Sequence, residues 1–337
     1  MRPFDYTRAR DAAEAVREAG IDGVKFIAGG TNLVDLMKGD VERPVRLVDI
    51  NRLPFDRIEE MKTGGLSIGA LVRNSDAAYD DRVERRYPLL SSALLAGASA
   101  QLRNAATVGG NLMQRTRCYY FYDTATPCNK RWPGSGCGAI GGVNRIHAIL
   151  GTSEQCIATH PSDMCVALAA LNAQVRVQGI RGERVIPMAD FHRLPGNTPE
   201  RDTNLEAGDL ITAVEMPDED FSRNYSYLKL RDRLSFAFAL VSVAAALQLD
   251  GDSITEARIA LGGVAHKPWR NEDAEAMLIG KQPSRNLFEN VADTILAEAR
   301  GYGDNDFKIE LAGRAIVRAL EQAAAGRPQS QFDKRIS

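Results

Sequence analysis

Residues 26–33 read Phe26-Ile27-Ala28-Gly29-Gly30-Thr31-Asn32-Leu33, and this stretch decides how the first part of the chain folds. The apolar residues before the glycines predict a buried strand, the glycine pair predicts a tight turn, and Thr31 or Asn32 is suited to cap a following helix. Free backbone N–H groups at a helix N-terminus favour a diphosphate. The stretch therefore predicts a nucleotide cradle, although it contains neither the G-x-G-x-x-G spacing nor the P-loop lysine.

A second glycine turn of the same kind lies at Thr107-Val108-Gly109-Gly110-Asn111. A single Gly-Gly turn is explained as well by tight packing as by a ligand. A long cofactor with two phosphates and a flat ring needs close approach of the backbone at more than one place, which glycine permits. The two turns together favour a nucleotide cofactor.

Composition and charge exclude several classes of protein. The 337 residues suggest two domains, and 42 basic against 44 acidic residues give a net charge of −2. Nucleic-acid binding is disfavoured, because it requires a cationic surface. The longest run without a charged residue, Gly or Pro, 234–249, is shorter than the roughly 20 residues that a membrane helix needs. Charges are scattered through the first eleven residues, so we expect no export signal on this chain.

Four of the five cysteines gather in one segment: Cys118, Cys128, Cys137 and Cys156. The segment from about 115 to 158 shows almost no hydrophobic period and is interpreted as an inserted loop. The spacing matches neither the C-x2-C pairs of zinc sites nor ferredoxin runs, so an iron–sulfur cluster, zinc and disulfides all stay open. Disulfides are disfavoured without an oxidising compartment.

Glycines at 134, 136, 138, 141 and 142 favour an iron–sulfur centre over zinc, because they let the backbone wrap around a bulky centre and donate N–H groups to its sulfurs. Cys165 follows in an apolar helix, where a small buried thiol is the usual case. His147 and His160 adjoin the loop, but ordinary hydrogen bonding explains them better than metal binding. These three side chains are therefore left out of the predicted ligands.

Regular structure surrounds the loop. Ser162 or Asp163 caps a predicted apolar helix, and the acidic stretch 217–224 is the predicted domain boundary. The remaining patterns predict helices at 11–19 and 88–98, strands at 24–28, 44–50, 66–71, 174–177, 210–216, 225–230, 238–248 and 254–261, and a helical C-terminal region.

Several motifs together resemble one family. The two glycine turns are similar to the FAD-binding motifs of the medium, flavin-carrying subunit of the xanthine dehydrogenase family of molybdenum hydroxylases. Ser162-Asp163, Tyr227-Leu228-Lys229 and Leu261-Gly262-Gly263-Val264-Ala265 fit later landmarks, so the resemblance spans nearly the whole chain. Most members lack the cysteine insertion. The flavin subunits of 4-hydroxybenzoyl-CoA reductase and of bacterial periplasmic aldehyde oxidoreductase have it and carry an extra [4Fe-4S] cluster, and the cysteine stretches most resemble the latter.

The resemblance implies an α+β fold. An FAD-binding domain of the vanillyl-alcohol-oxidase (PCMH) type would occupy residues 1–220 as two α/β subdomains, with the iron–sulfur loop at about 115–158. A smaller α+β domain of the CO-dehydrogenase flavoprotein type would follow at 224–325, and a polar tail at 326–337.

The resemblance also implies the roles of individual residues. The first glycine stretch would hold the pyrophosphate, and Thr107, Gly110, Asn111 and Asp163 would line the ribityl and ring side of FAD. Leu210 is expected to pack on the ring and Lys229 to lie near it. Cys118, Cys128, Cys137 and Cys156 would bind the [4Fe-4S] cluster. No His occurs before 147 and neither glycine turn contains Cys, so we expect non-covalent FAD.

The predicted function is that of an electron-transfer subunit. An aldehyde would be oxidised to a carboxylic acid at a molybdenum cofactor on a large partner, and electrons would reach the FAD of this chain through [2Fe-2S] clusters on a small partner. The complex is expected in the periplasm, exported by a twin-arginine signal on a partner, with the cytoplasm as the alternative. Two other functions stay open: a zinc-stabilised structural or binding module, and a free-standing flavin oxidase.

Overall fold

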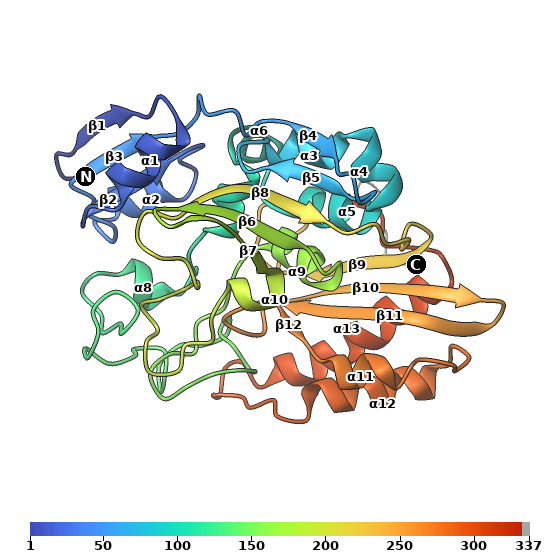
Figure 1. Ribbon diagram of the computed structural model, residues 1–337. Helices are drawn as coiled ribbons and strands as arrows, with labels where there is room; N and C mark the ends of the chain where they lie inside the picture. The colour runs from blue at the N-terminus through green and yellow to red at the C-terminus, as the bar shows by residue number, and fades with distance from the viewer. Residues whose placement is uncertain (332–337) are drawn as a thin grey trace.

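A small parallel sheet with two helices forms the N-terminal part of the computed structural model, which describes residues 1–331 (Figure 1). The strands are ordered β1-β3-β2, and their apolar side chains pack on α1 and on Leu71 and Leu210 of the neighbouring region. Asp11 caps α1 by accepting a hydrogen bond from the backbone N–H of Glu14. The elements are β1 (Asp5–Arg8), α1 (Ala12–Ala19), β2 (Val24–Ile27), α2 (Leu33–Lys38) and β3 (Arg46–Asp49).

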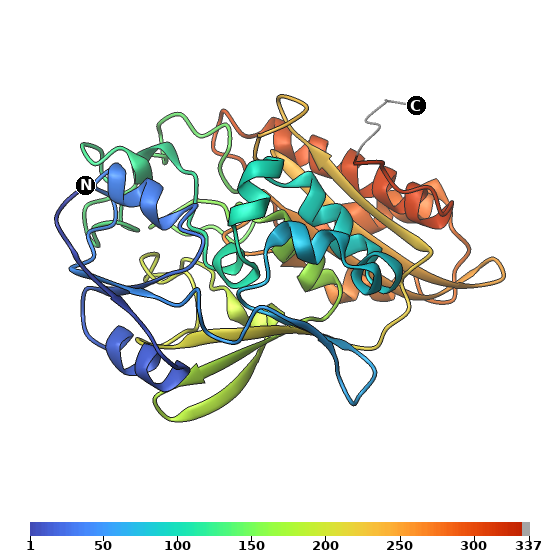
Figure 2. The same ribbon diagram turned by 90° about the horizontal axis from the view of Figure 1, so that it is seen from above.

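A five-stranded antiparallel sheet, ordered β4-β5-β8-β6-β7, forms the second part. Its buried side chains face a layer of helices, of which α5 and α9 are largely apolar and lie between this sheet and the next (Figure 2). The strands are β4 (Ile58–Glu60), β5 (Leu66–Gly69), β6 (Gln174–Gly179), β7 (Gly182–Pro187) and β8 (Leu210–Met216). The helices are α3 (Asn74–Tyr79), α4 (Asp81–Arg86), α5 (Pro88–Ala96), α6 (Ala100–Ala105), α7 (Val108–Leu112), α9 (Asp163–Ala170) and α10 (Met188–Phe191).

The C-terminal part is a four-stranded antiparallel sheet, ordered β12-β11-β10-β9, that carries helices on both faces. Alternate residues of β10 face two cores, because side chains alternate along a strand. Ala244 and Ala246 join the core of the helix layer, whereas Val243 and Ala245 pack against α12 and α13. The elements are β9 (Asn224–Leu230), β10 (Val241–Asp250), β11 (Ser253–Gly262), β12 (Trp269–Arg270), α11 (Glu272–Ala276), α12 (Arg285–Leu296) and α13 (Phe307–Ala324).

One predicted strand is wrong at its start. β10 begins at Val241, where its pairing with Leu230 of β9 begins, and not at Phe238. Phe236 has a φ of +50°, and the side chains of Phe236 and Phe238 are about half exposed. The apolar residues 236–239 therefore belong to a partly exposed loop that precedes the strand.

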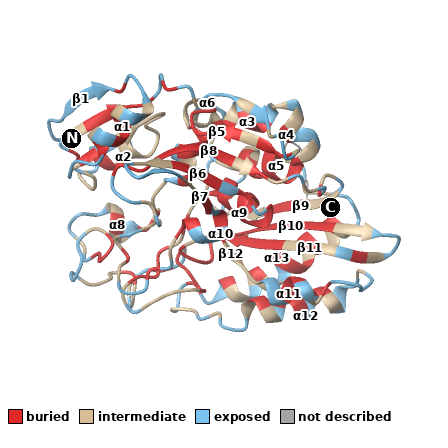
Figure 3. Cartoon of the chain, viewed as in Figure 1, coloured by how far each residue is buried: buried red, intermediate tan, exposed pale blue. Residues whose placement is uncertain are grey.

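The segment that contains the four cysteines folds mainly as turns. Its regular element is one short helix, α8 (Tyr119–Tyr122), and it lies beside α2 at the end of the molecule that holds the N-terminal sheet (Figure 1). Buried residues concentrate on the central strands and the helices between the sheets (Figure 3). In residues 1–331 we find no helix long and apolar enough to cross a membrane.

The predicted α+β fold is confirmed, with two subdomains before a smaller C-terminal domain. Only the first subdomain has a parallel sheet, whereas the sheet of the second is wholly antiparallel. Residues 326–331 of the predicted polar tail carry no helix or strand, and residues 332–337 lie outside the described residues.

Candidate functional site

The first glycine turn is closed by contact with the chain that leads into the second. A Cβ atom on Gly29 would lie 2.1 Å from the carbonyl oxygen of Ala105, so only glycine fits there. Gly30 has a φ of +69°, a left-handed conformation that also favours glycine. The sequence pattern therefore reflects real backbone requirements at both positions.

The side chain of Asn32 does not cap α2, which corrects one of the two predicted capping roles. Asn32 occupies the N-cap position, but its Oδ1 accepts a hydrogen bond from the backbone N–H of Arg115 at 2.8 Å. Its Nδ2 is buried without a partner in the protein. A buried donor without a partner is costly, so this atom points to a ligand acceptor in the neighbouring cleft.

The second glycine turn starts α7 and is fixed to the five-stranded sheet. The hydroxyl of Thr107 accepts a hydrogen bond from the backbone N–H of Gly110 at 3.1 Å, and the backbone N–H of Gly109 donates to the Ala70 carbonyl at 2.8 Å. Asn111 turns away toward α9, where its Oδ1 accepts a hydrogen bond from the Ser162 hydroxyl at 2.7 Å. The first turn is thus held against Ala105, and the second is held against Ala70 at the end of β5.

A cavity of about 250 Å³ lies between the turns. It is lined by the whole stretch 26–33 and by Thr107, Gly110 and Leu210, which comes from β8. Lys25, Glu42, Arg115 and Asp209 also line it and were not predicted from the sequence. A cleft floored by glycine backbone, with an apolar wall and a buried unpaired amide, fits an extended dinucleotide such as FAD.

Asp163 and Lys229 form a buried ion pair outside the lining of this cavity. Lys229 Nζ lies 2.7 Å from Asp163 Oδ2 and donates a second hydrogen bond to the Ala96 carbonyl, while the Tyr227 hydroxyl donates to Asp163 Oδ1 at 2.7 Å. Ser162 caps α9 through the backbone N–H of Cys165. The pair joins the helix layer to β9, and its role toward FAD stays a prediction.

The four predicted ligand cysteines line a single small pocket, together with His147 and Lys130. Cys128 and Cys137 face each other across an antiparallel bridge, and all five cysteines of the chain are free thiols. Burial raises the pKa of Cys118 to about 12 and that of Cys156 to about 11, where the charge of Lys130 acts in the opposite direction. In the structure, none of the four forms a disulfide with another.

Polar groups lie close to two of the four sulfur atoms. The backbone N–H of Ala158 donates to Cys156 Sγ at 3.4 Å, and His147 Nε2 lies 3.1 Å from Cys118 Sγ. Glycines let the loop close tightly: a Cβ on Gly138 would lie 2.5 Å from the ring of Tyr120. Converging thiols with nearby donors fit a centre held by thiolate ligands.

Candidate metal ligands gather at two places in the described residues 1–331. Tetrahedral zinc with Zn–S bonds of about 2.3 Å places its sulfurs about 3.8 Å apart. Within residues 1–331, the one group of three candidate ligands whose atoms lie within 4.8 Å of one another is His160, Cys165 and His192. Four thiols in one pocket supply the ligand number of either tetrahedral zinc or one iron–sulfur cluster.

His160, Cys165 and His192 are better explained as core packing than as a metal site. The two imidazole rings are stacked at a tilt, with centroids 4.1 Å apart, which is too close for two ligands of one tetrahedral ion. His192 Nε2 lies 2.9 Å from the Leu112 carbonyl oxygen, and burial lowers the pKa of His192 to about 4. The prediction that hydrogen bonding explains His160 agrees with this arrangement, since His160 Nδ1 accepts from the backbone N–H of Ser162.

Two family models together cover almost all of the chain. The FAD binding domain in molybdopterin dehydrogenase matches residues 2–219, and the CO dehydrogenase flavoprotein C-terminal domain matches residues 225–323. The chain therefore belongs to the FAD-binding subunits of the molybdenum hydroxylase family, and the resemblance inferred from the glycine turns is confirmed. It is a subunit of an enzyme of this type.

The chain is similar over most of its length to individual proteins of this family. The chain is 53% identical, over 96% of its length and 99% of the relative's, to the aldehyde oxidoreductase FAD-binding subunit PaoB of Escherichia coli K12. It is 30% identical to the glyceraldehyde dehydrogenase medium chain of Sulfolobus acidocaldarius, over 90% of each chain. Among solved structures, a chain of the carbon monoxide dehydrogenase from Hydrogenophaga pseudoflava matches 97% of this chain and 100% of its own, at 27% identity and a TM-score of 0.76.

Proposed function

We propose that this chain is the FAD- and [4Fe-4S]-carrying electron-transfer subunit of a molybdenum-dependent aldehyde oxidoreductase. The observation that carries the proposal is that the two candidate cofactor sites share a wall. Leu36 lines the flavin cavity and also belongs to the buried cluster that contains Cys118, Cys128 and Cys156. Two redox sites separated by one layer of side chains are suited to electron transfer.

In the flavin half of the proposal, the chain supplies binding and position. Backbone N–H groups of the first glycine turn would face the diphosphate, and Leu210 provides an apolar wall. Bound FAD supplies the exchange between two-electron and one-electron steps. No His or Cys lies in either glycine turn, which supports non-covalent attachment.

In the metal half, Cys118, Cys128, Cys137 and Cys156 hold one [4Fe-4S] cluster. Four thiols that line one pocket support this assignment. Zinc in this pocket would contradict the assignment. A zinc site would show no visible absorption, so the two metals are easily distinguished.

The substrate and partners are proposed from the relatives. The 53% identical relative is named as a subunit of an aldehyde oxidoreductase, and others are named as medium chains. We therefore assign aldehyde oxidation to a large molybdenum-cofactor subunit and intermediate electron transfer to a small [2Fe-2S] subunit. Export of the assembled complex by a partner's twin-arginine signal is part of the proposal, and cell fractionation tests it against a cytoplasmic location.

The decisive experiment is to purify the chain anaerobically, alone and with its two partners. We expect the isolated chain to contain flavin that acid releases and four iron atoms with matching sulfide, and we expect aldehyde oxidation only in the assembled complex. Flavin that stays with the acid precipitate contradicts non-covalent binding. Zinc in place of iron contradicts the cluster, and substantial turnover by the isolated chain supports a free-standing flavin oxidase instead.

A further inference from the structure

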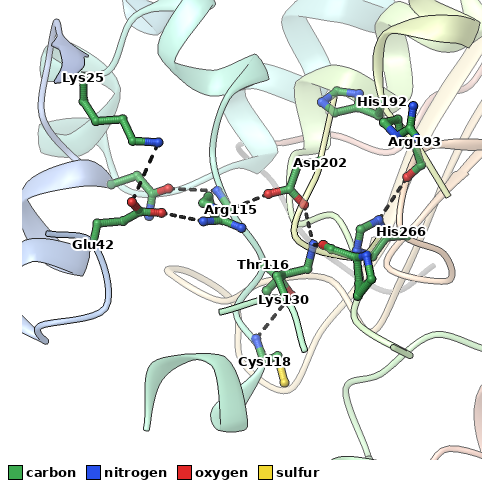
Figure 4. Close-up of polar contacts among 12 residues, drawn as sticks. Lys25, Glu42, Arg115, Thr116, Cys118, Lys130, His192, Arg193, Asp202 and His266 are labelled. Atoms are coloured by element: carbon green, nitrogen blue, oxygen red, sulfur yellow. Dashed lines mark hydrogen bonds and ion pairs between the residues drawn. The ribbon is translucent and has the colours of Figure 1, made fainter. Parts of the chain in front are cut away.

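A network of four side chains with alternating charges extends from the flavin cavity to the cysteine pocket (Figure 4). Glu42 and Arg115 line the flavin cavity, and Lys130 lines the cysteine pocket. Asp202 stands between them and bonds to both cations through its two oxygens. This charge network therefore connects the two candidate redox sites through ion pairs.

Each pair of neighbours in this charge network is in direct contact. Arg115 donates from Nη1 to Glu42 and from Nε to Asp202 Oδ2 at 2.8 Å. Lys130 donates from Nζ to Asp202 Oδ1 and to the Pro199 carbonyl at 2.7 Å. Arg115 also lies over the ring of Phe121, 4.8 Å from its centroid. Lys130 has only 1% of its side chain exposed, so its charge is not screened by water.

Asp202 stays ionised in this setting. Burial by itself would raise the pKa of its carboxyl group, but the charges of Lys130 and Arg115 outweigh burial and hold the pKa well below its usual range. One nitrogen of Arg115, Nη2, is buried without a partner in the protein. Since Arg115 lines the flavin cavity, this donor is available to a bound ligand.

We propose that Asp202 is a positioning residue that holds Lys130 against the cysteine centre and Arg115 against the flavin cleft, and thereby sets the reduction potentials of both. This inference rests on the proposed function. A positive charge beside a redox centre favours its reduced, more negative form and raises its potential. The carboxylate of Asp202 offsets part of both positive charges.

The signs of the expected changes separate this role from a merely structural one. Asp202→Asn keeps the shape of the side chain and removes its charge, so the potentials of both centres should rise. Lys130→Met removes the cation beside the cysteines, so the potential of the cluster should fall while that of the flavin changes less. Loosening of the loop alone would not produce opposite shifts from two variants of one ion pair.

The matched control is Glu275→Gln, which removes the carboxylate of another buried ion pair. Glu275 bonds to Arg270 at 2.8 Å, and these side chains are 7% and 15% exposed. Neither residue lines the flavin cavity or the cysteine pocket. This variant should leave both potentials at their wild-type values.

The test is a redox titration of the assembled complex, with the flavin followed optically and the cluster by electron paramagnetic resonance. We expect Lys130→Met to change the equilibrium constant for electron distribution between the two centres at least tenfold, equivalent to 59 mV for a one-electron couple. If the Lys130→Met variant loses the cluster of the cysteine pocket, the Asp202→Asn variant still tests the proposal, because it retains Lys130 and all four cysteines.

Two different failures remain distinguishable. A wild-type chain that contains no iron when it is purified alone overturns the proposed function itself. Wild-type complex with its cluster, but with potentials in Asp202→Asn that match those of the Glu275→Gln control or move downward, overturns only the coupling role of Asp202.

Discussion

The flavin cleft and the cysteine loop are held in different ways, since the cleft lies at the ends of strands and helices whereas the loop folds mainly as turns. In the cleft, backbone fixes backbone: Gly29 touches the Ala105 carbonyl, and Gly109 is bonded to Ala70 at the end of a sheet strand. In the loop, side chains hold backbone: Arg131 donates to the carbonyls of Tyr120 and Phe121 at 2.6 and 2.8 Å.

This difference predicts that the cleft keeps its shape without its cofactor, whereas the loop depends on its metal centre for order. The supports of the cleft belong to sheets with large apolar cores, so its shape should persist without FAD. The loop has a small core made largely of its own cysteines and aromatic rings. Thiolate ligation should therefore supply much of its order.

The largest effect should come from breaking the loop. Replacing Cys118, Cys128, Cys137 or Cys156 by Ser substitutes a hard, poorly ionised oxygen for a soft thiolate, so iron should be lost and the loop should become protease-sensitive. The flavin should stay bound, because its cleft has separate supports. Iron, sulfide and flavin per chain, with limited proteolysis, measure this. Loss of flavin in step with iron would show that the two regions are not independent.

The converse change should empty the cleft and spare the loop. Gly29→Val places a side chain where only 2.1 Å separates the Cβ position from the Ala105 carbonyl oxygen, so FAD retention should be abolished while iron stays near the wild-type amount. Gly313→Ala, where the added Cβ would meet Leu296 at an ordinary 3.6 Å, is the matched control and should keep both cofactors. Normal flavin content in Gly29→Val would move the binding site elsewhere.

A buried lysine sharpens the comparison through pH. Lys308, on α13, donates to the carbonyl of His147 in the loop and to that of Gly263, and burial, followed by the charge of Arg145, lowers its pKa from 10.5 to about 7. The unfolded chain therefore binds more protons than the folded one between these values, so stability rises with pH in that window.

We expect wild type to gain up to about 2 kcal/mol relative to Lys308→Met between pH 7 and 9, as measured by denaturant unfolding. The control is Lys267→Met, which removes a less buried lysine that also donates to a backbone carbonyl, that of Ala189 at 2.7 Å. Parallel pH profiles for wild type and Lys308→Met would contradict a buried, destabilised charge.

The two regions also differ in how far the sequence predicts them. The glycine turns are local patterns, and the requirement at Gly29 and the left-handed φ at Gly30 are properties that a short motif records. The clustering of four cysteines was equally visible. Asp202 carries no local signal, because it meets Lys130 across 72 residues and Arg115 across 87.

Errors in the predicted elements have similar causes. Phe238 is apolar but half exposed, so an apolar run placed the start of β10 too early. β7 was missed because its outward side chains and its single buried residue, Ile186, give no clear alternation. Both cases depend on tertiary neighbours, which a local pattern does not contain.

The smallest expected effect belongs to Cys165, the one cysteine outside the comparison. It lies fully buried in α9, next to the Ser162 cap, and burial raises the pKa of its thiol to about 12. A neutral thiol packed in a helix acts as a small apolar side chain. Cys165→Ala should therefore cost at most about 1 kcal/mol of stability and leave iron, sulfide and flavin unchanged. The four loop cysteines, tested as single Ser variants in the same assay, provide the contrast. If Cys165→Ala loses iron while one of the other four variants keeps it, the ligand assignment is wrong.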